Sequence, residues 1–222
     1  MAPIASVTPV ARPFRQSIDR RRQRGQQRGQ TLAEFAIIVP VFLLHIIGLI
    51  EFGFAFNANL ATNYASRAGG LVAAEAGNQA AADCLILSAI EGAITSPASA
   101  AQISRVDIQR TSPSGATVYA TSSYQRSGST SCTRLDGTSI TVPYSATSNG
   151  YPTSQRCNVL GPTGCPALTP ARTTVDTIAV QITYVYPWHT PLKSLVALMN
   201  GSLAGTGFTF TERNVFRMEP VL

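Results

Sequence analysis

The sequence contains few charged residues and few of the residues on which common catalytic motifs depend. Only 13% of the 222 residues are charged, which is about half the share of a typical soluble protein. Lysine occurs once, as Lys193, and it follows Leu192 rather than the glycine that a phosphate-binding loop requires. No G-x-S-x-G elbow is present, and a Ser/His/Asp arrangement would depend on His189 alone, between Pro187 and Pro191. We therefore predict that the chain is not an enzyme and has no catalytic residues, cofactor or small-molecule substrate.

Residue spacing typical of metal sites is missing as well. No two cysteines form a C-x-x-C pair and only two histidines occur, whereas a structural zinc site needs four clustered ligands. We predict no metal site and interpret the cysteines as disulfide candidates, with three possible pairings. Cys157–Cys165 is the easiest pair to form, because it closes a short loop containing glycine and proline. The four candidates are Cys84, Cys132, Cys157 and Cys165.

The positive charge is confined to the N-terminal arm. Residues 1–29 contain seven arginines and one acid, which accounts for the whole net charge of +6. Nucleic-acid binding needs a basic face on a folded element, and the rest of the chain is neutral overall, so we expect no nucleic-acid partner. Basic residues directly before an apolar stretch are typical of a flank that stays on the cytoplasmic side of a membrane. The arm is rich in proline, arginine and glutamine, and we predict that residues 1–29 are disordered.

An apolar run follows the arm and is long enough to cross a lipid bilayer. Leu32–Phe56 comprises 25 residues, which as a helix reach about 37 Å, against a hydrocarbon core of about 30 Å. We predict a transmembrane helix at 30–56, with the N-terminus in the cytoplasm and the rest of the chain exported. Glu51, near the outer end of this run, is interpreted as an interfacial residue.

From the composition and residue spacing of the remainder of the chain, we predict a small α+β domain. Residues 57–95 have apolar positions near helical spacing, so we expect the helix to continue out of the membrane, weakened at Gly69-Gly70 and stopped by Pro97. Residues 96–222 are rich in Ser, Thr, Gly and Pro, and they predict a loop-rich antiparallel β domain. Its expected elements are strands near 105–109, 140–144 and 177–186, a loop at 145–173, a short helix at 192–199 and a last strand near 208–218.

One motif lies at the junction of the basic arm and the apolar helix. The residues there read Arg28-Gly29-Gln30-Thr31-Leu32-Ala33-Glu34-Phe35. An ordinary secretory signal is cut after its apolar core, behind small residues, but here the glycine precedes the apolar run. The arrangement resembles the signal of type IV prepilins. More specifically, GQTLAEFAIIVPVFLL…GLIEFG resembles the start of TadE-like proteins of the tight-adherence (Tad, or Flp) pilus system, over about residues 28–75.

The resemblance implies a processing event and a set of partners. In that family a prepilin peptidase cuts after the glycine, so Gly29 would precede the cut, Gln30 would become the first mature residue, and Glu34 and Phe35 the fifth and sixth. A glycine admits the backbone to a protease site without side-chain collision. The implied partners are the peptidase, other Tad pilus subunits, the inner-membrane platform and the lipid bilayer. The implied location is the bacterial inner membrane, crossed once.

Glu34 is energetically unfavourable in the mature helix, because it holds a carboxylate at the edge of the hydrocarbon. Such groups are usually paired. The new α-amino group of Gln30 is a natural partner, in the same or a neighbouring subunit; alternatively, Glu34 reaches the interface alone. At 100° per residue, one stripe of the helix aligns with Glu34 and is a candidate packing face. His45 in this stripe is interpreted as a packing histidine rather than a proton relay. The stripe comprises Ile38, Val41, His45, Gly48 and Phe52.

Two functions from different classes are compatible with the sequence. The first is a minor pilin or pseudopilin of a Tad-type pilus or secretion apparatus, processed after Gly29. The alternative is an uncleaved, signal-anchored envelope protein whose exported domain binds a ligand. Tyr184, Tyr186 and Trp188 could form an adhesive patch on that domain, but core packing is the preferred interpretation.

Overall fold

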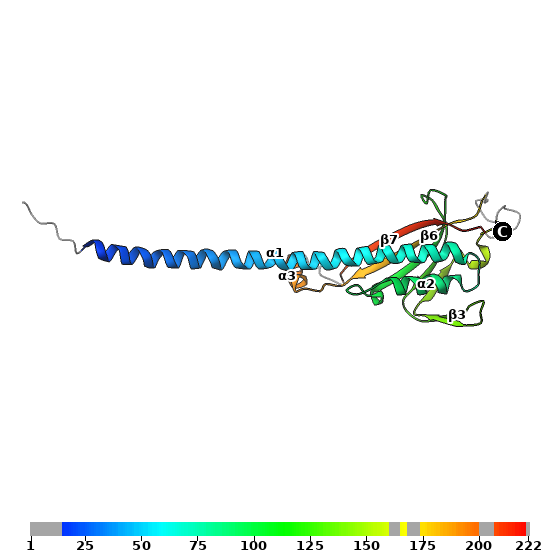
Figure 1. Ribbon diagram of the computed structural model, residues 1–222, viewed down its shortest axis with the longest axis horizontal. Coiled ribbons are helices and arrows are strands. Elements are labelled where there is room, and N and C mark those ends of the chain that lie inside the picture. The colour runs from blue at the N-terminus through cyan, green and yellow to red at the C-terminus, as the bar shows by residue number, and fades with distance from the viewer. Residues whose placement is uncertain (1–14, 160–164, 168–173, 200–206, 221–222) are drawn as a thin grey trace, which may run out of the picture. The chain divides into compact units, whose positions relative to one another are not determined.

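The computed structural model describes residues 15–159, 165–167, 174–199 and 207–220 (Figure 1). Its fold class is α+β, a long N-terminal apolar helix followed by a small antiparallel β domain, as predicted. The chain divides into two compact units, residues 1–49 and residues 50–222, which we describe separately. The boundary falls inside the first helix, α1 (Arg15–Ala76).

The first unit consists, over its described residues, of the N-terminal part of α1. The helix begins at Arg15, so residues 15–29 are helical where the sequence predicted disorder; residues 1–14 lie outside the described range. Arginine and glutamine have high helix propensity, and adding residues to an existing helix avoids the cost of nucleating a new one. The apolar helix that follows therefore extends into the basic arm.

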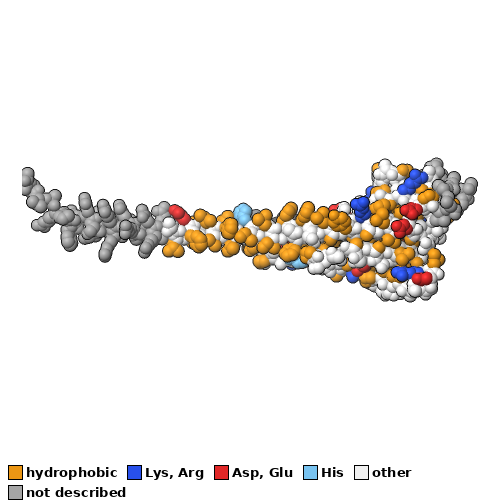
Figure 2. Space-filling model, viewed as in Figure 1, with side chains coloured by type: hydrophobic (Ala, Val, Ile, Leu, Met, Phe, Trp, Pro, Cys, Tyr) orange, Lys and Arg blue, Asp and Glu red, His pale blue; other side chains and the backbone are white. Residues whose placement is uncertain are grey.

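The apolar part of α1 is long enough to cross a membrane. Residues 31–76 form the one candidate span among the described helices, which is compatible with a single-pass membrane protein. Hydrophobic side chains line the visible face of this helix (Figure 2), and Phe35, Ile38 and Leu49 each expose more than 60% of their surface. Helix α1 continues through Pro40 without a break. An apolar surface of this kind is stable only against lipid or other apolar partners.

The second unit begins with the C-terminal part of α1, which ends earlier than predicted. The sequence predicts one helix to residue 95, whereas α1 stops at Ala76 and a separate helix, α2 (Ala82–Ala93), follows. Gly77 has φ +56°, a left-handed conformation that glycine adopts without a Cβ penalty. A glycine in this position after the last helical residue ends α1, whereas the expected weak point, Gly69-Gly70, stays helical.

The β domain is built on a five-stranded antiparallel sheet with the order β5-β2-β1-β6-β7. The strand β6 pairs with β1 on one side and with β7 on the other. The predicted strand 177–186, the last strand and the short helix α3 (Leu192–Met199) are all present. The bounds are β1 (Ile103–Thr111), β2 (Val118–Gln125), β5 (Ser145–Asn149), β6 (Thr177–Tyr186) and β7 (Phe208–Arg217).

Two features of this region differ from the prediction. The expected loop at 145–173 contains the strand β5 and a short 3₁₀ helix, η2 (Thr153–Gln155). β5 consists of Ser, Ala, Thr and Asn, so it lacks an apolar alternation and is held at the sheet edge by its pairing with β2. A separate hairpin is formed by β3 (Thr130–Thr133) and β4 (Ser139–Val142), and Pro143 ends it.

The core lies between one face of the sheet and the two helices. Every second residue of β6 is buried on that face, as its alternating pattern predicted. Gly69 of α1 is close to both Ile90 of α2 and Val180 of β6, so α1 packs against α2 and against the sheet at this point. The large aliphatic side chains that are fully buried in this core are Ile86, Leu87, Ile90, Ile103, Ile108, Ile178 and Ile182.

Candidate functional site

The most distinctive arrangement in the second unit joins α1 to the sheet through polar contacts. We call it the docking seam: residues 51–74 of α1 together with the residues that bond to them from β6, β7, the β6–α3 loop and the segment after β7. At its centre, Asn59 and Asn63 donate from their side-chain amides to the two carboxylate oxygens of Glu212, at 2.9 and 3.0 Å. The two asparagines are four residues apart, so both face β7 from successive turns of the helix.

Further bonds extend the docking seam toward the end of α1. The Ser66 hydroxyl donates to the carbonyl of Val180 at 2.8 Å, in the strand β6, which has a neighbouring strand on each side. Asn214 of β7 donates to the same hydroxyl at 3.1 Å. The backbone N–H of Glu219 donates to the carbonyl of Ala74 at 3.1 Å. Each bond to a buried group gives a partner to a polar atom, and burying that atom without a partner would cost free energy.

Glu51 closes the docking seam at the end nearest the N-terminus of α1. Its side chain is only 4% exposed, although the sequence placed it at an interface. One carboxylate oxygen accepts from the Tyr186 hydroxyl at 2.6 Å and from the His189 N–H at 3.1 Å; the other accepts from the Thr190 N–H at 2.8 Å. Three donors therefore compensate a carboxylate that stands within an apolar run. We call these four residues the Glu51 cage.

Tyr186 is held in its protonated form by the Glu51 cage. Burial of the ring, together with the hydrogen bond to the Glu51 carboxylate, raises the pKa of the Tyr186 hydroxyl above its ordinary value. Tyr184 and Tyr186 are 2% and 1% exposed, so the preferred interpretation, core packing, is confirmed, and an adhesive patch made by these two side chains is excluded.

A second polar network lies inside the β domain, and sequence reasoning missed it. Asp176 accepts from Arg110 at 3.2 Å and from the Tyr151 hydroxyl at 2.8 Å, and all three residues are buried. Arg156 is fully buried, pairs with Asp83 of α2 and lies 5.2 Å from the centre of the Tyr151 ring. No local spacing links these positions, which are distant in sequence. The network joins α2, β1 and the segment after β5, and so it stabilises the domain that carries the docking seam.

Both pairs of cysteines are disulfide-bonded. Cys84–Cys132 joins α2 to β3 with a Cα–Cα distance of 6.1 Å, and Cys157–Cys165 has a distance of 5.4 Å. Of the three pairings left open, the structure selects the one that contains the expected short-range pair. Two disulfides suit a domain that functions in an oxidising compartment.

The two disulfides should contribute unequally to stability. They span 48 and 8 residues, and loop-closure entropy assigns about 4 kcal/mol to the longer loop and about 2.5 kcal/mol to the shorter one. We expect C84A/C132A to lower the melting temperature of the oxidised protein more than C157A/C165A does. Thermal melts of the full chain under oxidising and reducing conditions check this. Equal losses would contradict the assignment of Cys84–Cys132 as the main covalent constraint.

The glycine pair of α1 lies where the helix is packed against the sheet. A Cβ at Gly70 would be 2.2 Å from a ring carbon of Phe216. We expect Gly70→Val to displace this ring and to destabilise the protein by about 1–3 kcal/mol. A Cβ at Gly92 of α2 would meet no atom within 4 Å, so Gly92→Ala should instead be neutral or slightly stabilising, because alanine favours the helix. Chemical denaturation of both variants measures the difference.

The residues of the expected cleavage motif lie on α1, in the first unit. Gly29 and Gln30 are helical, and the side chain of Gln30 is not among those that the structure describes. Glu34 and Phe35 are both exposed. The cut after Gly29 and the pairing of Glu34 with the new amino group stay predictions.

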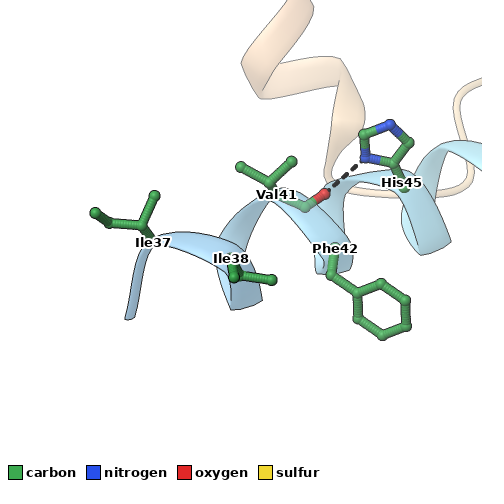
Figure 3. Close-up of a pocket in the computed structure, with 5 residues that line it drawn as sticks. All are labelled: Ile37, Ile38, Val41, Phe42 and His45. Carbon is green, nitrogen blue, oxygen red and sulfur yellow. Dashed lines mark hydrogen bonds between the residues drawn. The ribbon is translucent and has the colours of Figure 1, made fainter. Parts of the chain in front are cut away.

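The candidate packing stripe is an exposed apolar surface on the same helix. Figure 3 shows three members of the stripe, Ile38, Val41 and His45, which line a shallow hollow on α1. Ile37 and Phe42, which lie outside the stripe, line the same hollow. The His45 ring is fixed by a bond between its Nδ1 and the Val41 carbonyl, four residues earlier, at 2.8 Å. The remaining members of the stripe are Gly48, which is partly buried, and Phe52, which is 68% exposed. Whether another helix packs on this stripe stays a prediction.

Comparison with known proteins finds one family that matches part of this chain. The family described as TadE-like protein matches residues 29–71, which include the expected cleavage motif, the apolar run and most of the docking seam's residues on α1. The match agrees with the resemblance seen in the sequence and indicates a component associated with the Tad pilus. No curated protein and no solved structure gives a significant match.

Proposed function

We propose that this chain with a TadE-like segment is a membrane-anchored structural subunit, a minor pilin or pseudopilin, of a Tad pilus or secretion apparatus. It acts without catalysis. The proposal includes processing by a prepilin peptidase after Gly29, a cytoplasmic N-terminus and a β domain on the far side of the inner membrane. The observation that carries it is the TadE-like match at residues 29–71, because these residues contain both the motif and the span.

The fold of the second unit supports this role. A subunit that enters an assembly through an apolar helix must keep its folded domain fixed to that helix. The docking seam provides this attachment through bonds at both ends of residues 51–74. A ligand-binding domain on a flexible anchor would not need such contacts, so the docking seam favours the structural role over the alternative of an anchored envelope protein.

Isolation of the protein from its own membranes tests the proposal. The full chain, tagged at its C-terminus, should copurify in mild detergent with other Tad subunits and should begin at Gln30. Glu34→Gln should weaken this copurification, because it removes the charge proposed to pair with a neighbouring subunit. Glu75→Gln, at an exposed acid of the same helix, is the matched control and should copurify normally. An intact leader and no pilus partners would favour the anchored envelope protein.

A further inference from the structure

The short helix α3 exposes two large apolar side chains. Leu195 and Leu198 are 40% and 86% exposed. At 100° per residue they lie next to Leu192 and Val196, which are half-buried, and opposite Lys193. The helix therefore turns one edge of its apolar face to the domain and leaves the other edge uncovered.

The position of α3 along the chain's membrane axis is set by the Glu51 cage. His189 and Thr190, which come directly before α3, bond through their backbone N–H groups to Glu51. Glu51 precedes Phe56, the end of the apolar run, by five residues, or about 8 Å of helix. The start of α3 is thus held beside residues that belong to the membrane-spanning run.

The composition of this segment matches the boundary between lipid and water. Residues 187–199 contain no acid and hold the only lysine and the only tryptophan of the chain. Tryptophan is enriched at membrane interfaces, and lysine can extend its charged end to the headgroups while its stem stays in apolar surroundings. The Trp188 ring contacts Phe208, which is itself 38% exposed.

We propose that α3 lies in the interface of the same bilayer that α1 crosses, with Leu195 and Leu198 among the acyl chains and Lys193 at the headgroups. This inference rests on the proposed membrane anchoring. Lipid is favoured over a protein partner because the Glu51 cage holds the start of α3 beside the apolar run of α1. An interfacial helix needs an apolar edge and a polar edge, and α3 has both.

A second lipid contact would fix the orientation of the β domain. A domain attached to one helix can rotate about the axis of that helix, whereas a second contact to one side prevents rotation. With α3 in the interface, each subunit would present the same sheet face to its neighbours before assembly.

Trp188 provides a direct probe, because it is the only tryptophan. The full chain is placed in nanodiscs, one copy per disc, whose lipids carry bromine near the headgroup or deep in the acyl chain. We expect Trp188 fluorescence to be quenched more by the shallow bromines than by the deep ones. Leu198→Glu should remove roughly half of this quenching, because a charged side chain lifts α3 from the acyl region. The matched control, Leu135→Glu, alters a side chain that is 85% exposed in the β3–β4 turn and should leave the quenching unchanged.

The outcomes separate the two proposals. If the chain does not enter nanodiscs, the membrane anchoring fails and the inference fails with it. If the chain inserts but Trp188 is not quenched, or if L198E and wild type are quenched equally, anchoring stands and the lipid contact of α3 is wrong. If L198E alters the quenching only in discs that hold two copies of the chain, α3 is a protein interface, and this result would also overturn the inference. Unchanged melting temperatures for L198E and L135E would show that both variants fold.

Discussion

Glu51→Ala is expected to lower the melting temperature of the full chain in detergent by about 10 °C. The substitution leaves the Tyr186 hydroxyl and the N–H groups of His189 and Thr190 without their acceptor. Bonds to a charged group contribute more than neutral ones, and losing this acceptor should cost about 3 kcal/mol. For a domain of this size that corresponds to roughly 10 °C. The fluorescence of Trp188 reports the unfolding transition.

Two further variants show whether the effect comes from the cage. Glu75→Ala removes an exposed acid from the same helix and should change stability by less than about 0.5 kcal/mol. Glu51→Gln keeps one acceptor oxygen, so its loss should lie between those of E51A and E75A. If E51A and E75A have the same melting temperature, the Glu51 cage contributes no net stability and the docking seam must be held by its other bonds.

Gly29→Leu is expected to slow processing of the N-terminus by about a hundredfold or more, because a misplaced scissile bond loses the geometry that catalysis needs. The variant would keep all 29 leader residues, and mass spectrometry of the purified chain would detect them. The retained arginines would then oppose extraction of α1 from the bilayer, because their charges would have to cross hydrocarbon. Pilus assembly should be lost with processing.

A control is needed because α1 is helical at this position. Leucine stabilises a helix by about 1 kcal/mol relative to glycine, so G29L could resist cleavage simply by preventing local unwinding. Gly25→Leu makes the same substitution one turn earlier and should still be processed at a rate close to that of wild type. Equal blocking by both variants would show that helix stability, rather than the side chain at the cut, controls processing. Normal processing of G29L would refute the proposed cleavage site.

The features that follow from local pattern were predictable from the sequence. The apolar run and the alternation in residues 177–186 each depend on neighbours within one or two turns, and each predicted an element that is present. The motif around Gly29 is equally local, and the family that it resembles is the one that matches residues 29–71. The helix 192–199 was found for the same reason. Local signals did not locate the end of the first helix, which was predicted at residue 95 and lies at Ala76. Gly77, which ends the helix, and Gly69-Gly70, which stay helical, look alike in sequence and differ only in what surrounds them.

The partners of buried polar groups were not predictable. Glu51 stood out as an acid in an apolar run, but nothing near it in sequence identifies Tyr186, His189 and Thr190 as its donors. These residues lie more than 130 positions away, and only the fold brings them together. The same holds for Glu212 with Asn59 and Asn63. An unexplained acid is a signal that donors exist, although it does not say which residues supply them.

The arrangement of bonds along α1 also determines how the molecule responds to tension. The contacts of the docking seam are distributed between Glu51 and Ala74, over about 35 Å of helix, and they join α1 sideways to the strands. A pull along the helix axis would load these contacts together in shear instead of breaking them one after another. Rupture under force is governed by the barrier to unfolding, so a shared load favours slow detachment when the anchor and the domain are drawn apart.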